Sequence, residues 1–243
     1  MLRPIAYFIA VRFFRFFFWL LARVEIRGRE NIPPHGPYIV IANHFSQYEV
    51  PLISILLPQS PHFFAAEELA HYWLMRLAMW INDSIAVRRG QVDREALKRA
   101  FHLLETGQTV AIFPEGGITT VTIEAGARGE LTHEMHDQSA RHDARLLPAR
   151  PGAAYVATHS QVPILPIAVL GTEKMGENIK QWKRTDIQVI IGRPFGPLGG
   201  ENGLRGREKR TQLDQLGHQM MQHLAALVPP ENRGVYGEDG EVV

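Results

Sequence analysis

The feature that most constrains the fold is a short apolar run that stops abruptly at a polar turn. Residues 39–42 read Ile-Val-Ile-Ala, and Asn43-His44-Phe-Ser-Gln-Tyr-Glu49 follow directly. A short apolar run bounded by turn residues is typical of a strand buried on both faces, as in parallel sheets. We therefore expect this run inside a sheet, with the polar turn emerging at the carboxyl edge of that sheet.

Strand-like and helix-like segments alternate along the rest of the chain. Pro163 and Pro166 favour an edge or irregular position for the strand at 162–170, because proline cannot donate to a ladder. The alternation predicts an α/β fold with a largely parallel central sheet flanked by helices, and with sites where strands end. Strands are expected at 24–28, 38–42, 62–66, 85–87, 109–113, 162–170 and 186–191, and helices at 49–57, 69–80, 93–105, 152–159 and 204–227.

Composition limits the chemistry that this chain can carry out. Its 243 residues are enough for one domain with a sizeable core. The chain has no cysteine, which excludes disulfides, thiolate metal sites and cysteine nucleophiles. A formal net charge of +1 gives no general attraction to nucleic acid, so we expect no nucleic-acid partner. The oligomeric state is left open.

Residues 1–29 are far more apolar and aromatic than the rest of the chain. Arg12 and Arg15 interrupt the apolar run, so no uncharged stretch reaches the roughly 20 residues that span a bilayer. On a helix, Arg12, Arg15 and Arg23 would share one side, which is typical of a helix lying in the membrane interface. Six arginines against Glu25 would also attract anionic headgroups.

Two other interpretations of this N-terminal segment are less favoured. A signal peptide is disfavoured because charges break the apolar region and no small-residue cleavage site follows it. An ordinary core helix stays open, although a small domain has little surface with which to cover so many aromatic side chains.

The turn after residues 39–42 carries a candidate acid–base pair. If His44 lies before the helix that starts near Glu49, the carboxylate can accept from one ring nitrogen and leave the other to take a proton. The same residues also fit a purely structural role, because Ser46-Gln-Tyr-Glu49 is a capping box. This stretch alone favours neither interpretation.

Two further polar stretches follow strands. Residues 114–117, Pro-Glu-Gly-Gly, form a tight turn that can present backbone N–H groups to an anion. Arg88 and Arg89 follow the strand at 85–87, where two guanidinium groups can clamp a phosphate. Taken in isolation, these stretches are more often a plain turn and a pair of solvated arginines.

Together and in this order, these stretches resemble the 1-acyl-glycerol-3-phosphate acyltransferases and related glycerolipid acyltransferases. Four blocks carry the resemblance, which covers about residues 36–170. The close at 229–236 is similar to that of some bacterial members. The blocks are Asn43-His-x-Ser-x-x-Glu49, Arg89-Gly90, Phe113-Pro-Glu-Gly116 and Val162-Pro-Ile-x-Pro-Ile-Ala168.

The resemblance implies transfer of a fatty acyl group from acyl-CoA or acyl carrier protein to the hydroxyl of a lysolipid. It implies no other cofactor and no metal, membrane lipids as partners, and a place at the cytoplasmic face of a bacterial plasma membrane. His44 would be the general base, oriented and polarised by Glu49. It also assigns Arg89 to the acceptor phosphate, Glu115, Gly116 and Gly117 to the acceptor-binding loop, and Pro163 and Pro166 to the acyl pocket. Arg88, at a neighbouring position that is often acidic in the family, is a further candidate for substrate binding.

This chain departs from the family pattern in two places, and the second departure bears on the substrate. The first block usually ends in aspartate, whereas this chain has Glu49. The third usually reads Pro-Glu-Gly-Thr-Arg, whereas residues 114–118 read Pro-Glu-Gly-Gly-Ile, without the hydroxyl and the arginine. Arg88, Arg128 and Arg150 are candidate replacements. A different glycerolipid or glycolipid acceptor, or a catalytically silent lipid-binding protein, stays an alternative.

We expect three parts: an N-terminal membrane-associating segment at 1–29, an acyltransferase domain at 30–230 and a loose tail at 231–243. A polar insertion at about 118–148 lies within the domain and is expected to form a mobile flap beside the Glu115 loop. A metal site, and with it a metal-dependent hydrolase, is the less favoured interpretation of that insertion. The histidines and aspartates concerned are His133, His136, Asp137, His142 and Asp143.

Overall fold

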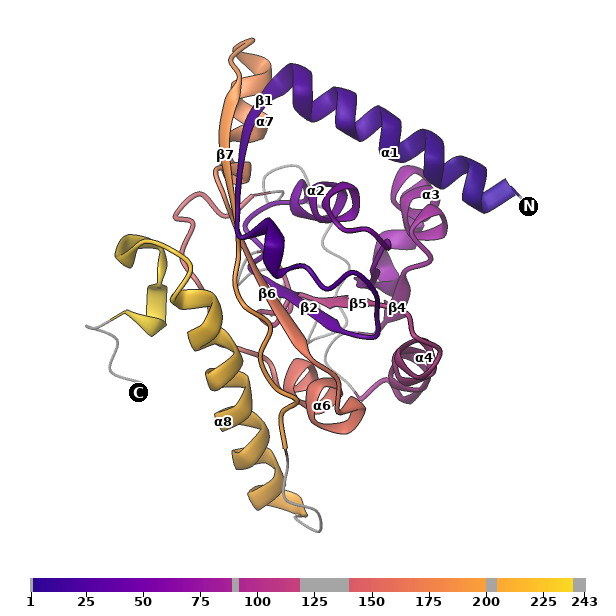
Figure 1. Ribbon diagram of the computed structural model, residues 1–243, viewed down its shortest axis with the longest axis vertical. Helices are drawn as coiled ribbons and strands as arrows, with labels where there is room; N and C mark the ends of the chain where they lie inside the picture. The colour runs from indigo at the N-terminus through magenta and orange to yellow at the C-terminus, as the bar shows by residue number, and fades with distance from the viewer. Residues whose placement is uncertain (1, 89–91, 119–139, 200–204, 238–243) are drawn as a thin grey trace.

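A seven-stranded sheet with helices on both faces forms the body of the computed structural model (Figure 1). The structure describes residues 2–88, 92–118, 140–199 and 205–237. The strands are β1 (Ala22–Arg27), β2 (Ile39–Ala42), β3 (His62–Ala66), β4 (Ile85–Val87), β5 (Val110–Ile112), β6 (Ile164–Leu170) and β7 (Thr185–Ile191). The helices are α1 (Leu2–Leu21), α2 (Glu49–Leu56), α3 (Trp73–Ile81), α4 (Arg94–Glu105), α6 (Pro151–Ser160), α7 (Met175–Lys180) and α8 (Gly206–Ala225).

The strand order is β1-β7-β6-β2-β5-β3-β4. Every neighbouring pair is parallel except β6 and β7, which run antiparallel. The expected α/β fold with a largely parallel sheet is therefore confirmed. β2 lies in the middle of the sheet, between β6 and β5, so the turn that follows it emerges at the centre of the carboxyl edge.

Alternate side chains of β2 point into two separate cores. Ile39 and Ile41 pack with buried residues of α4, α6 and α8 on one face. Val40 and Ala42 pack with α1 and α2 on the other face. Because helices cover both faces, all four residues are apolar, which is the pattern that the sequence showed.

The strand predicted at 162–170 lies in the interior of the sheet as β6, so the expected edge position was wrong. β6 pairs with β2 on one side and β7 on the other. Pro163 precedes the strand, and its carbonyl accepts from the Ile39 N–H at 2.9 Å. The ladder with β7 begins only at Ile167 and Ile191, so the N–H that Pro166 lacks falls outside it.

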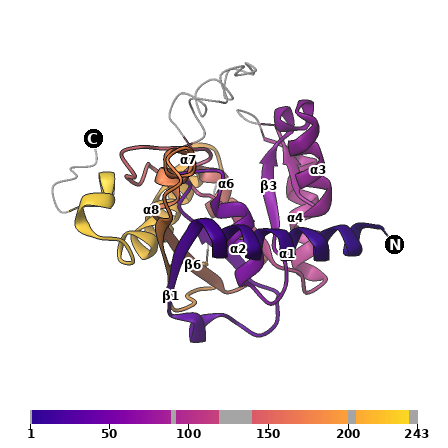
Figure 2. The same ribbon diagram turned by 90° about the horizontal axis from the view of Figure 1, so that it is seen from above.

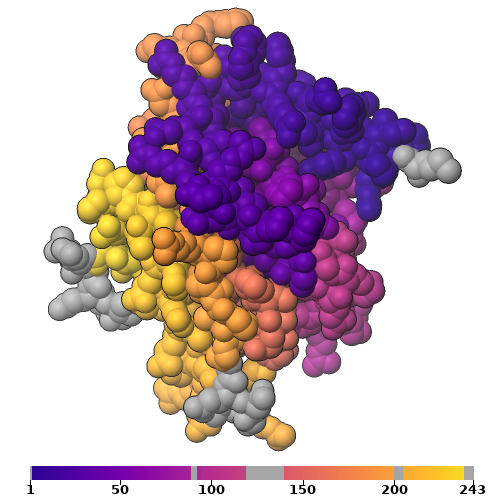
Figure 3. Space-filling view, viewed as in Figure 1, coloured from indigo at the N-terminus to yellow at the C-terminus, as the bar shows by residue number. Residues whose placement is uncertain are grey.

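Most of the N-terminal segment forms one 20-residue helix, α1, which crosses α2 and α3 (Figures 1 and 2). The helix lies at the edge of the molecule (Figure 3). Phe18 is its buried residue, so it is not an ordinary core helix. Within the described residues it is the helix long and apolar enough to cross a membrane, judged by length and composition. Arg23 lies in β1, where it faces Asp186 at 3.6 Å, so it does not share a helix side with Arg12 and Arg15 as expected.

Two other expectations need correction. The segment expected as one helix at 69–80 is a 3₁₀ turn, Glu67–His71, followed by α3. The chain at 231–237 is not loose: Asn232 donates to the Ala144 carbonyl at 2.8 Å, and the Tyr236 hydroxyl accepts from the Ala149 N–H at 3.0 Å. The packing of this segment against residues 144–149 gives it fixed partners.

Candidate active site

His44 lies in the turn that leaves β2 at the carboxyl edge of the sheet. Its Nδ1 is 3.0 Å from a carboxylate oxygen of Glu49, at the first residue of α2. The imidazole stacks on the ring of Phe113, with 3.9 Å between centroids and 12° between planes. The side chain is 15% exposed and lines a large cavity. Since Nδ1 is engaged by Glu49, Nε2 is the nitrogen available to a substrate.

Glu49 is fully buried and is held by a ring of neutral donors. The Ser46 N–H lies 2.9 Å from both carboxylate oxygens, and the Thr172 hydroxyl also donates to the carboxylate. The Ser46 hydroxyl accepts from the Tyr48 N–H at 3.2 Å. The bond from the Ser46 N–H to Glu49 is the carboxylate contact of the predicted capping box. Glu49 makes this structural contact and the contact to His44 at the same time.

A second buried carboxylate, Glu115, holds the backbone of His44. It accepts from the His44 N–H at 2.9 Å and from the Leu147 N–H at 2.9 Å, and it forms an ion pair with Arg141. Burial raises the pKa of the Glu115 carboxyl, and the charge of Arg141 opposes that rise. His44 is therefore fixed at two points, its ring by Glu49 and its main chain by Glu115.

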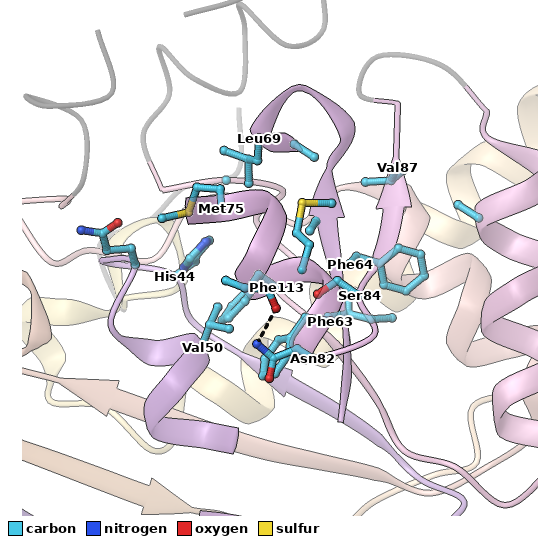
Figure 4. Close-up of a pocket in the computed structure, with 18 of the residues that line it drawn as sticks. His44, Val50, Phe63, Phe64, Leu69, Met75, Asn82, Ser84, Val87 and Phe113 are labelled. Carbon is cyan, nitrogen blue, oxygen red and sulfur yellow. Dashed lines mark hydrogen bonds between the residues drawn. The ribbon is translucent and has the colours of Figure 1, made fainter. Parts of the chain in front are cut away.

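The cavity beside His44 has a volume of about 2240 Å³ and mostly apolar walls. Residues of α1, α2, β3 and α3 line it, and Figure 4 shows His44 with Val50, Phe113 and Met75 around it. Ligand pockets for drug-sized molecules are usually about 300–1,000 Å³. A cavity of this size and polarity can take a long apolar chain next to an imidazole.

One family model matches a large part of this sequence. The family model described as Acyltransferase covers residues 23–170, which is more than half of the chain. The chain belongs to the acyltransferase family. That range contains the turn with His44 and Glu49 and the turn with Glu115.

Curated relatives of this acyltransferase-family chain include proteins named 1-acyl-sn-glycerol-3-phosphate acyltransferase. It is 29% identical over 150 residues to the mouse protein named 1-acyl-sn-glycerol-3-phosphate acyltransferase alpha, covering 60% of this chain and 45% of the relative. It is 27% identical over 200 residues to a chloroplast 1-acyl-sn-glycerol-3-phosphate acyltransferase of Brassica napus, covering 79% and 50%. The chain thus spans about half the length of the curated relatives it matches.

A solved structure has the same fold. The 1-acyl-sn-glycerophosphate acyltransferase of Thermotoga maritima superposes with a TM-score of 0.56 at 24% identity, over 90% of this chain and 79% of that one. This likeness supports the fold, including the mainly parallel sheet.

The remaining site residues predicted for this acyltransferase-family chain lie in different surroundings. Gly116 and Gly117 line the cavity, in a tight turn where Gly116 has φ +81° and its N–H donates to the Phe113 carbonyl at 3.0 Å. Arg88 also lines the cavity, paired with Glu67 at 2.8 Å. Arg89 lies outside the described residues.

Three predicted residues are not among the described residues that line the cavity. Glu115 is buried behind the turn. Pro163 is exposed beside Ile39, at the opposite end of β2 from His44, and Pro166 is buried in β6. The sheet geometry therefore separates both prolines from the apolar walls to which the resemblance assigned them.

Most of the residues behind the metal interpretation lie outside the described residues, namely His133, His136 and Asp137. His142 and Asp143 are described and exposed. No group of three or more metal-ligating side chains occurs within the described ranges. Arg128 also falls outside them, whereas Arg150 lines the cavity and its side chain lies against Gly116.

Three residues that hold this site were not predicted from the sequence. Asn43 pairs its side-chain amide with the N–H and carbonyl of Val169, both at 2.7 Å, and so fixes the turn to β6. Thr172 donates to Glu49, and Arg141 pairs with Glu115. Asn43 stands in the quoted first block, but no local pattern marks Thr172 or Arg141.

Proposed function

We propose that this chain is a membrane-associated acyltransferase that moves a fatty acyl group from a thioester to the hydroxyl of a lysophospholipid such as 1-acyl-glycerol-3-phosphate. The donor is acyl-CoA or acyl carrier protein. The observation that carries the proposal is His44, held by Glu49 at 3.0 Å, beside a large apolar cavity. The names of the mouse and Brassica napus relatives support the lysophospholipid acceptor.

In this reaction Nε2 of His44 takes the proton of the acceptor hydroxyl. The hydroxyl oxygen attacks the thioester carbonyl carbon, the C–S bond breaks, and the departing thiolate takes the proton back from the imidazolium. Glu49 keeps the proton on Nδ1 and stabilises the imidazolium between the two transfers. No covalent enzyme intermediate is required.

The acceptor phosphate would be bound at the side of the cavity near the Gly116-Gly117 turn. Arg150 is the first candidate to bind the phosphate there, because its side chain lies against Gly116. Its backbone N–H donates to the Pro114 carbonyl at 2.7 Å, which fixes it beside the turn. Arg88, also at the cavity wall, is the second candidate. A guanidinium at this position would supply the charge that Ile118 does not provide.

The lipid substrates would reach the cavity from the membrane, at the cytoplasmic face of a bacterial plasma membrane. Two adjacent helices that line the cavity, α1 and α3, expose large apolar side chains that a bilayer can cover. These side chains are Leu2, Ile5, Phe8, Ile9, Phe13, Phe16, Trp19 and Leu20 of α1, and Trp73, Leu74, Leu77 and Trp80 of α3.

The test is acyl transfer from labelled acyl-CoA and labelled acyl carrier protein to a panel of lysophospholipids and glycolipids. His44→Ala should lower turnover by about 10²- to 10⁴-fold, the usual contribution of general acid–base catalysis. His102→Ala, on α4, is the matched control and should keep activity. Activity that survives His44→Ala would contradict the mechanism, and a wild-type protein that binds lysolipid without transfer would favour a silent lipid-binding role.

A further inference from the structure

The strongest feature outside the reacting groups is a buried ion pair behind the turn that carries His44. Glu115 is 0% exposed and Arg141 is 6% exposed. One oxygen of Glu115 accepts from the His44 N–H, and the other accepts from the Leu147 N–H and from Arg141. The Glu115 side chain therefore connects the charge of Arg141 to the main chain of His44.

Arg141 is built into this place by contacts with three separate segments. Its side chain donates to the carbonyls of Gly117 at 3.0 Å, Ile118 at 2.6 Å and Arg145 at 2.7 Å. The guanidinium also lies over the ring of Phe45, 5.4 Å from its centroid. One guanidinium thus ties residues 140–147 to both polar turns of the site.

The charge of Arg141 does not reach a substrate. Arg141 is not among the described residues that line the cavity, and its guanidinium donors are directed at Glu115 and at backbone carbonyls. It therefore cannot stand in for the phosphate-binding arginine that the third block lacks. What it can do is keep Glu115 ionised in a buried place, because an unpaired buried carboxylate is costly and becomes protonated instead.

We propose that Arg141 is a positioning residue of the acyl transfer reaction, and that it acts through Glu115 on the main chain of His44. The proposal rests on the proposed function. Without the guanidinium, Glu115 loses its counter-charge, and its bond to the His44 N–H weakens. The imidazole then moves relative to the acceptor hydroxyl, and even a small displacement of a catalytic group lowers the reaction rate strongly.

Arg141→Met tests the proposal by removing the charge while keeping a long apolar side chain. We expect turnover to fall by about ten- to a hundredfold, while KM for the lysolipid changes by less than about threefold. Arg145→Met is the matched control, since it makes the same change on an exposed side chain of the same segment. Arg141→Lys should give an intermediate value, because lysine keeps the charge without the planar set of donors.

The double variant Glu115→Gln/Arg141→Met decides whether the effect runs through Glu115. A neutral glutamine needs no counter-charge, and its carbonyl can still accept from the His44 N–H. The double variant should therefore exceed Arg141→Met in turnover and in yield of folded protein. A double variant no better than Arg141→Met in either measure would overturn the proposal, and so would an Arg141→Met variant with unchanged turnover or with a loss confined to KM.

A readout that needs no activity separates this proposal from the proposed function. Amide hydrogen exchange at His44, followed by NMR, should be faster in Arg141→Met than in the wild type and should slow again in the double variant. If the wild type transfers no acyl group to any acceptor, the proposed function fails and the exchange series still decides the position of His44. Equal exchange in all three proteins would overturn the role of Arg141.

Discussion

The two carboxylates that hold His44 are equally buried but have different partners. Glu49 contacts the imidazole and otherwise accepts from neutral donors of Ser46 and Thr172. Glu115 contacts the His44 main chain and is paired with the cation of Arg141. A charge already neutralised by arginine can support geometry, whereas one surrounded by neutral donors is available to stabilise an imidazolium. We therefore propose that Glu49 acts in the reaction and that Glu115 acts on the fold around it.

Of the two carboxylates, Glu49 should give the larger effect on turnover when it is replaced by glutamine. The amide cannot stabilise the imidazolium, so we expect kcat to fall by about a hundredfold, at the low end of general acid–base contributions. Glu49→Asp keeps the charge and should retain substantial activity. Steady-state kinetics on both variants, with Glu105→Gln at the end of α4 as control, makes the test. Equal activity in the glutamine and aspartate variants would mean that Glu49 serves mainly as a cap.

Sequence reasoning predicted the parts of the fold and site that depend on neighbours in the chain. The apolar run of β2, the ends of β3 and β4, and the approach of His44 to Glu49 all follow from local patterns. The interior position of β6 did not follow. Prolines disfavour an interior strand only where a ladder needs their N–H, and here the ladder with β7 starts after Pro166.

The supporting contacts of the site could not be predicted because they join distant parts of the chain. Thr172 is 123 residues from Glu49, Asn43 is 126 residues from Val169, and Arg141 is 26 residues from Glu115. The local composition around Glu115 suggested an anion-binding turn, and only the packing reveals that its carboxylate faces inward. Hydroxyl, amide and guanidinium groups of this kind are common on surfaces, so their types alone carry no signal.

Glu115→Gln should lower stability more than turnover, whereas Glu49→Gln should lower turnover more than stability. The glutamine carbonyl can still accept from the His44 N–H, so we expect kcat to fall by less than about tenfold. Breaking a buried ion pair leaves Arg141 without its counter-charge, and this should lower the free energy of unfolding by about 3–5 kcal/mol. Urea denaturation of Glu115→Gln and of Glu49→Gln measures the free energy of unfolding that each variant loses. A larger loss of stability in Glu49→Gln than in Glu115→Gln would contradict the division of roles.

Thr172→Val should give a smaller effect on turnover than Glu49→Gln, and it tests whether the neutral donors around Glu49 matter. Valine keeps the shape of the side chain but removes the hydroxyl that donates to the carboxylate, with Thr172 fully buried. A hydrogen bond to a charged group contributes about 1.5–3 kcal/mol, and Glu49 keeps its bonds from Ser46. We expect kcat to fall by about five- to tenfold, because one lost bond leaves the carboxylate mobile beside the imidazole.

Thr172→Ser should restore most activity, since it returns the hydroxyl. Thr211→Val, on the exposed side of α8, is the control for the substitution itself. Full activity in Thr172→Val would show that the Ser46 N–H and the His44 ring hold Glu49 without the Thr172 hydroxyl.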